Sequence, residues 1–240
     1  INDELEKASY SVLKVQTKKV TRQPAPPFIT STLQQEAWRR LHFSAKQTMA
    51  IAQQLYEGLT IGNEGSVGLI TYMRTDSTRV AQSALNEARE FIGGKYGAEF
   101  VPPRARYFTK TVKGAQEAHE AIRPTRIGRE PSLIKKHHNA NQFKLYELIW
   151  KRMVASQMAA ALFDNTTVDI EASLGAQPKY LLRTSSSVNR FPGFTLLYIE
   201  GKDQADEEKL SPLPQLAKGD ALKLLGLFPE QHFTQPPPRF

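Results

Sequence analysis

The feature that most constrains the fold is a change in hydrophobic periodicity that occurs twice along the chain. Residues 9–20 alternate between apolar and polar side chains, though imperfectly, as is typical of a strand. The apolar residues then recur at helical spacing until about residue 160, and period-two alternation returns at 166–171. This order predicts an α+β, multidomain fold in which a mostly helical domain is inserted into a β-rich domain.

A proline-rich segment marks the first crossing between the two domains. Residues 22–28 contain three prolines, which remove backbone donors and fix φ, so regular structure should stop there. We therefore expect a discontinuous β-rich domain over 1–30 and 160–240. The helical domain is expected over 31–159.

Helix-start signals divide the helical domain further. Ser31 and Thr32 each precede a glutamine by three residues, which is the spacing of a capping box, and Ser44 repeats that signal. The first helix should run to about Leu41, and one face of the second should hold Thr48, Ala52, Leu55 and Tyr56. The remaining elements are expected as helices over 82–96 and 139–158, a loop over 57–67, and strands over 68–75, 179–184, 194–199 and 220–228.

Composition restricts the class of protein. The net charge of +8 and the pI near 9.6 favour a partner that is a polyanion. The absence of cysteine excludes disulfides and thiolate metal sites, and no apolar stretch approaches the roughly 18 residues of a membrane span. The charged first residues indicate no signal peptide, and the lack of an initial methionine suggests a piece of a longer protein.

The first polar cluster surrounds Tyr72. In an extended chain Tyr72, Arg74 and Asp76 project to the same side. A tyrosine hydroxyl is a poor nucleophile unless its phenolate is favoured, and a guanidinium can favour it while binding a phosphate oxygen in a bidentate pair. Asp76 could orient Arg74 or a histidine. Spacing alone leaves a second reading open, in which Tyr72 is a half-buried strand residue beside a surface ion pair.

The second polar cluster lies around His119. Glu117, His119, Glu120 and Arg123 combine a proton carrier, two acids and an arginine just before a proline. A zinc-protease helix is excluded, because position 123 would have to be a second histidine. His119 could donate a hydrogen bond to a phosphate or could be a structural histidine at a helix end.

Taken together, the two clusters resemble the bacterial type IA DNA topoisomerases. The matching strings are Gly68-Leu-Ile-Thr-Tyr-Met-Arg-Thr-Asp-Ser77 and Ala115-Gln-Glu-Ala-His-Glu-Ala-Ile-Arg-Pro124. The resemblance also includes 26–35 and 231–240, and it is weakest at 98–112 and 173–215.

The resemblance implies a role for individual residues. Tyr72 stands where the family has the nucleophile that forms a 5′-phosphotyrosine link, and Arg74 and His119 stand where it contacts the scissile phosphate. Asp76, Glu117 and Arg123 are implied to support them. Further basic residues expected to contact DNA are Arg39, Arg40, Lys46 and Arg79.

The resemblance also implies partners and cofactors. The expected substrate is single-stranded and negatively supercoiled DNA, relaxed without ATP. Mg²⁺ would be bound by another domain of the same polypeptide, so this chain alone should be inactive. The implied location is cytoplasmic, on bacterial DNA. In the implied layout, the β-rich domain is an arch that lets the helical domain swing.

Two alternatives remain open at this stage. One is a basic module that binds single-stranded DNA without covalent chemistry. The other is a different type IA member, a topoisomerase III or the topoisomerase half of a reverse gyrase. A type IB enzyme or tyrosine recombinase is disfavoured, because no Arg-Lys-His-Arg set precedes Tyr72.

Overall fold

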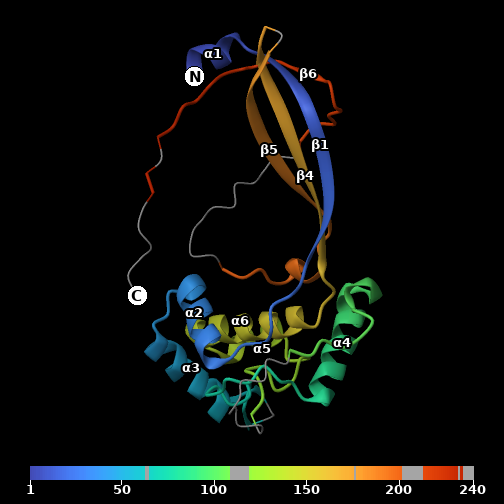
Figure 1. Ribbon diagram of the computed structural model, residues 1–240. Coiled ribbons are helices and arrows are strands. Elements are labelled where there is room, and N and C mark those ends of the chain that lie inside the picture. Colours follow the sequence, from blue (N-terminus) through green and yellow to red (C-terminus); the bar gives the residue numbers. More distant parts are fainter. Residues whose placement is uncertain (63–64, 109–118, 176, 202–212, 232, 235–240) are drawn as a thin grey trace. The chain divides into compact units, whose positions relative to one another are not determined.

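The computed structural model describes residues 1–240 except 63–64, 109–118, 176, 202–212, 232 and 235–240. The chain forms two compact units, which are considered separately (Figure 1). The sheet unit comprises Ile1–Val20, Phe163–Val188 and Glu207–Phe240, and the helical unit comprises Thr21–Leu162 and Asn189–Asp206. Helices and an antiparallel sheet thus coexist, which confirms the α+β class.

The sheet has the strand order β5-β4-β1-β6, and its three long strands lie side by side (Figure 1). Their bounds are β1 Ser9–Arg22, β4 Ala161–Leu174 and β5 Gln177–Phe191, and β6 is Ala221–Leu222. The expected strands at 9–20, 166–171 and 179–184 are therefore confirmed, and each is longer than predicted. A short helix, α1 Asn2–Lys7, is tied to β5 because Lys179 and the Tyr180 hydroxyl both donate to Glu4.

The strand expected at 194–199 is wrong, and the one expected at 220–228 is reduced to the two-residue strand β6. Residues 194–199 contain the 3₁₀ turn η4 Gly193–Leu196, because Gly193 adopts φ +49° and lies against the carbonyls of Ala159 and Ala160. A Cβ at Gly193 would approach both oxygens to 2.5 Å. Over 220–228, only β6 pairs with β1, and Leu225 and Phe228 are exposed. Apolar residues without a partner strand or a core surface do not extend a sheet.

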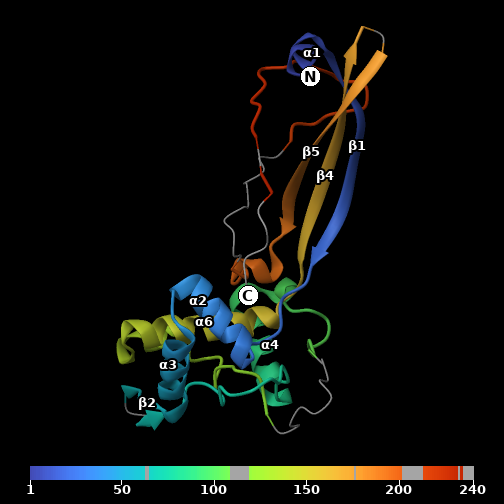
Figure 2. The same ribbon diagram turned by 60° about the vertical axis from the view of Figure 1, so that its left-hand side comes forward.

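The helical unit is built around its longest helix, α6 Ala140–Ser156, against which α2 Thr30–Leu41 and α3 Ala45–Glu57 pack (Figure 2). Two further helices are α4 Gln82–Tyr96 and α5 Pro131–Ile134, with 3₁₀ turns η2 Ala98–Phe100 and η3 Lys135–His137. The four long helices confirm the helical periodicity. Their shared core includes Leu33, Leu55, Ile92, Leu145, Tyr146, Ile149 and Met153. No described helix is long and apolar enough to cross a membrane.

The helix starts differ in how well the sequence predicts them. Ser44 caps α3 as expected, since its hydroxyl accepts from Gln47 N at 3.2 Å. The boxes expected at Ser31 and Thr32 are wrong, because the N-cap of α2 is Ile29 and Thr32 accepts from Ile29 N at 3.0 Å. The helix begins earlier because Thr30 is fixed by bonds to another segment, described below.

The stretch between α3 and α4 also departs from expectation. The predicted loop 57–67 contains a small hairpin of β2 Leu59–Thr60 and β3 Ser66–Val67. The predicted strand 68–75 makes one isolated bridge, between Ile70 and Pro124. Its backbone is hydrogen-bonded first to the end of α3, then to residues 121–125, and then to the first residue of α2. No continuous ladder of β-sheet hydrogen bonds therefore forms.

Candidate active site

The segment that bears Tyr72 leaves the end of α3 in close contact with it. Leu69 N donates to Leu55 O at 2.7 Å. A Cβ at Gly68 would lie 2.8 Å from the carbonyl oxygen of Tyr56, so this approach requires glycine. The position of the segment therefore depends on Gly68.

The segment is next bound by residues 121–125, which follow the second polar cluster. Thr71 N donates to Arg123 O at 2.9 Å, and Thr125 N donates to Leu69 O at 2.9 Å. The Thr71 hydroxyl donates to Ala121 O at 2.7 Å. These bonds bring two sequence motifs that are far apart in the chain to one place.

The first residue of α2 holds the other end of the segment. Thr30 N donates to Thr75 O at 2.9 Å, and the Thr30 hydroxyl donates to Met73 O at 2.8 Å and accepts from Thr75 N at 2.9 Å. Met73 and Thr75 are buried, whereas Tyr72, Arg74 and Asp76 are exposed. This alternation places the three candidate side chains on the open side of the segment.

The Tyr72 ring lies between two other rings. Its centroid is 5.8 Å from that of His119 at an interplanar angle of 56°, and 5.5 Å from that of Tyr56 at 65°. Tyr72 is 39% exposed, so part of the residue is open to solvent. Tyr56 was expected on one face of α3 with Thr48, Ala52 and Leu55, but those three residues are buried and Tyr56 is exposed.

Arg74, Asp76 and His119 line one cleft of about 500 Å³. Its other wall is the start of α2, including Ser31 and Gln34. Sequence analysis missed these two residues as site residues and treated them as helix-capping signals. Asp76 shares this cleft with Arg74 and His119, and its role in orienting either of them stays a prediction.

Of the residues expected to support the site, Arg123 is described by the structure and Glu117 is not. Arg123 is turned toward its own segment, with Nε 2.7 Å from Glu120 and a second donor to Pro124 O at 3.0 Å. Its side chain therefore stabilises the segment after His119. Glu117 lies outside the described residues.

Arg39 and Arg40, expected to contact DNA, both pair with the buried carboxylate of Glu36, at 3.3 and 3.0 Å. Glu36 also accepts from the Tyr198 hydroxyl at 2.7 Å and from Gly201 N at 3.1 Å. Burial alone would raise the pKa of Glu36, but hydrogen bonds from Tyr198, Gly201 and the two arginines outweigh it and hold the pKa below its usual value.

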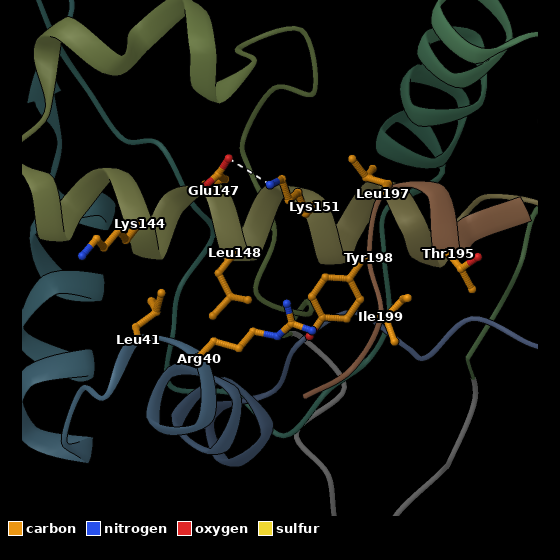
Figure 3. A pocket seen from close by; sticks show the side chains of 10 residues that line it. All are labelled: Arg40, Leu41, Lys144, Glu147, Leu148, Lys151, Thr195, Leu197, Tyr198 and Ile199. Carbon is orange, nitrogen blue, oxygen red and sulfur yellow. Dashed lines mark ion pairs between the residues drawn. The ribbon is translucent and has the colours of Figure 1, made fainter. Parts of the chain in front are cut away.

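Arg40 also lies over the Tyr198 ring, 4.8 Å from its centroid, in a second cleft of about 450 Å³ (Figure 3). Burial and the bond to Glu36 raise the pKa of the Tyr198 hydroxyl, which remains a donor. Arg39 and Arg40 therefore have structural roles in addition to any contact with DNA. Lys46 and Arg79 are exposed on the same unit.

The residues of the cleft do not fit a magnesium ion held by protein ligands alone. Mg²⁺ prefers near-octahedral oxygen coordination, with carboxylates as its usual protein ligands. Asp76 is the sole carboxylate lining the described cleft, and it shares that cleft with Arg74 and His119. The described part of the chain contains no group of three or more His, Asp or Glu side chains placed to hold a metal.

Comparison with known proteins agrees with the geometry. Residues 1–240 match the family described as DNA topoisomerase. The chain is also similar to full-length topoisomerase I from Thermotoga maritima, with 35% identity and a TM-score of 0.76 over 92% of this chain. It spans 34% of that structure's chain, about a third of its length. The chain therefore belongs to the bacterial type IA DNA topoisomerase family.

Proposed function

We propose that this chain is the nucleophile-bearing part of an enzyme that cuts and rejoins one DNA strand and so relaxes negative supercoils. The observation that supports this best is the placement of an exposed Tyr72 ring against His119, beside the cleft that Arg74 shares. Those residues come from two distant motifs, and backbone bonds at Thr71 join them.

The proposed reaction is a pair of transesterifications. The Tyr72 hydroxyl gives up its proton as its oxygen attacks phosphorus, the bond from phosphorus to the 3′ oxygen breaks, and that oxygen takes up a proton and leaves as a 3′ hydroxyl. The 5′-phosphotyrosine conserves the bond energy, so the 3′ hydroxyl attacks back without ATP. Arg74 can donate to the two non-bridging phosphate oxygens, and His119 can donate to one of the same two, which stabilises charge in the pentacovalent state. Positioning supplies much of the remainder.

The two units would have different roles in the reaction. The helical unit, which contains the predicted nucleophile domain 31–159, would carry the nucleophile. The sheet unit would be the arch predicted over 1–30 and 160–240, except that 21–30, 160–162 and 189–206 belong to the helical unit. Mg²⁺ would be held by another domain of the same polypeptide together with the DNA. The partners would be single-stranded and negatively supercoiled DNA in the bacterial cytoplasm.

Adduct trapping on the parent protein tests this proposal. The parent is incubated with a labelled single-stranded oligonucleotide and Mg²⁺, denatured, and digested for peptide mapping. We expect the label on the peptide that contains Tyr72, and none after Tyr72→Phe. Binding without an adduct would instead identify a non-catalytic DNA-binding module.

A separate experiment addresses this chain alone. Supercoiled plasmid and Mg²⁺ are added to the 240-residue chain, and we expect no relaxation, since the chain spans 34% of the matched full-length structure. Relaxed topoisomers that disappear with Tyr72→Phe would show that the missing domains are dispensable.

A further inference from the structure

One aromatic side chain of the helical unit is exposed without an explanation from the fold. Trp38, on α2, is 61% exposed, whereas the other tryptophan, Trp150, is 3% exposed and donates its indole N–H to Ile127 O at 2.8 Å. Indole rings bury a large apolar area when they contribute to a core, so a largely exposed one is available for contact with another molecule.

Trp38 lies on the same face of α2 as two residues of the candidate active site. Ser31, Gln34 and Trp38 are separated by three and four residues, the spacing that aligns side chains along one face of a helix. Ser31 and Gln34 line the cleft with Arg74 and His119. Seven residues of helix rise about 10 Å, so Trp38 lies about that far along the axis from Ser31.

We propose that Trp38 stacks against an unpaired base of the DNA strand whose phosphate occupies the cleft. The inference rests on the proposed function, because it takes the cleft as the site of the scissile phosphate. A stacked strand rises about 3.4 Å per nucleotide, so the base lies within about three nucleotides of the cut. Every base has an aromatic face, so this contact adds affinity without sequence selection.

Charge favours nucleic acid over a protein partner at this position. The chain has a net charge of +8, and the cleft at the start of the same helix face contains Arg74 and His119. A strand held by its phosphates at the cleft continues across α2 with its bases available to the indole ring. Phosphate contacts at one end and stacking at the other are the usual combination in single-strand binding.

The unequal exposure of the two tryptophans provides the first test. The 240-residue chain is titrated with oligothymidine and with an abasic oligonucleotide of equal length, while indole emission and iodide quenching are recorded. We expect oligothymidine to quench Trp38 and shield it from iodide, and the abasic strand to do neither. Equal effects from both strands would show that only phosphates are bound and would overturn the proposal.

Variants provide the second test. Trp38→Ala should weaken oligothymidine binding by roughly five- to ten-fold, while Trp38→Phe, which keeps a ring, should remain within about two-fold. Leu133→Ala is the matched control, because Leu133 is equally exposed in the same unit, on α5. A loss in Trp38→Ala no greater than in Leu133→Ala contradicts the stacking contact.

The two proposals fail in distinguishable ways. If the parent forms the Tyr72 adduct but Trp38→Ala binds normally, only the stacking contact is wrong. If Trp38 is quenched by bases but no adduct forms, only the covalent chemistry is wrong. Trp38 shielded from iodide in the DNA-free parent would mean that another part of that protein covers it, which also overturns the stacking contact.

Discussion

Thr71 and Arg123 are hydrogen-bonded to each other in both directions: Thr71 N donates to Arg123 O at 2.9 Å, and Arg123 N donates to the Thr71 hydroxyl at 3.0 Å. The same hydroxyl donates to Ala121 O at 2.7 Å. Tyr72 follows Thr71 directly, and His119 precedes Ala121 by two residues. Thr71 therefore helps to set the distance between the Tyr72 and His119 rings.

Replacing Thr71 by valine should loosen that connection without touching a reacting group. Valine keeps the shape but leaves Arg123 N and Ala121 O without their partner, which costs about 1–3 kcal/mol of unfolding free energy. Urea unfolding of the chain measures this loss. In the parent, adduct formation should fall while oligonucleotide affinity changes little.

Thr125→Val is the control for that variant. The Thr125 hydroxyl donates to Gly68 O at 2.8 Å in the same region but bonds neither Ala121 nor Arg123. It should lower stability with a smaller effect on the adduct. An equal loss of adduct in both variants would mean that general destabilisation, and not the Thr71 link, controls the ring geometry.

Glu36 should make stability depend on pH. Its folded pKa lies below the ordinary glutamate value of 4.5, so the carboxylate stabilises the fold above about pH 4.5, and this contribution is lost as pH falls through the folded pKa. Glu36→Gln weakens charge-assisted bonds from Arg39 and Arg40 and should cost about 1–3 kcal/mol at pH 7.

Urea unfolding at pH 7 and below pH 4 measures the effect. The difference between wild type and Glu36→Gln should shrink as the pH is lowered, because wild-type Glu36 then becomes neutral as well. Glu57→Gln is the control, since Glu57 is exposed and bonded only to Gln53 among the described residues. A difference that stays constant over this pH range would exclude Glu36 as the titrating group.

The sequence predicts these elements unequally, for physical reasons. Strong periodicity placed α4 correctly at 82–96, and Ser44 marked the start of α3, because both signals are local. The start of α2 depends on bonds from Thr30 to Met73 and Thr75, which sequence spacing does not reveal. The same limit hid the roles of Ser31 and Gln34 as cleft residues.

In the candidate site, too, the sequence predicts local relations but not contacts between distant segments. Period-two geometry placed Tyr72, Arg74 and Asp76 on one side, because that relation is local to an extended segment. The contact between Tyr72 and His119 depends on Gly68 and Thr71, which bind segments distant in sequence. From the sequence, only the family resemblance predicts that the Tyr72 and His119 clusters lie together; residue spacing does not.

Variants of Lys46 and Arg40 distinguish a residue that contacts DNA from one that stabilises the fold. Lys46→Gln removes an exposed charge and should leave stability within about 0.5 kcal/mol of wild type. If Lys46 binds a phosphate, the slope of log affinity against log salt should fall by about 0.7 for single-stranded DNA. Titrations of the chain at several salt concentrations measure that slope.

Arg40→Gln should behave differently. It removes the bond to Glu36 and the contact with the Tyr198 ring, so it should lower the unfolding free energy by about 1–2 kcal/mol. Urea unfolding checks this value. A stable Arg40→Gln variant with a reduced salt slope would instead identify Arg40 as mainly a DNA contact.

Arg74→Lys tests whether the guanidinium shape matters beyond its charge. Lysine keeps the charge but cannot offer two parallel donors to a phosphate. We expect adduct formation in the parent to fall by about 10- to 100-fold, corresponding to about 1.4–2.7 kcal/mol. Oligonucleotide affinity should change by less than three-fold, since overall charge is retained.

Arg74 is exposed, so the unfolding free energy measured in urea should be unchanged in Arg74→Lys. Single-turnover cleavage with saturating oligonucleotide distinguishes slower bond cleavage from weaker binding. Arg126→Lys is the matched control, because Arg126 is another exposed arginine of the helical unit and lies outside the cleft. If Arg74→Lys cleaves at the wild-type rate, Arg74 contributes only charge, and the bidentate phosphate contact in the proposed mechanism is wrong.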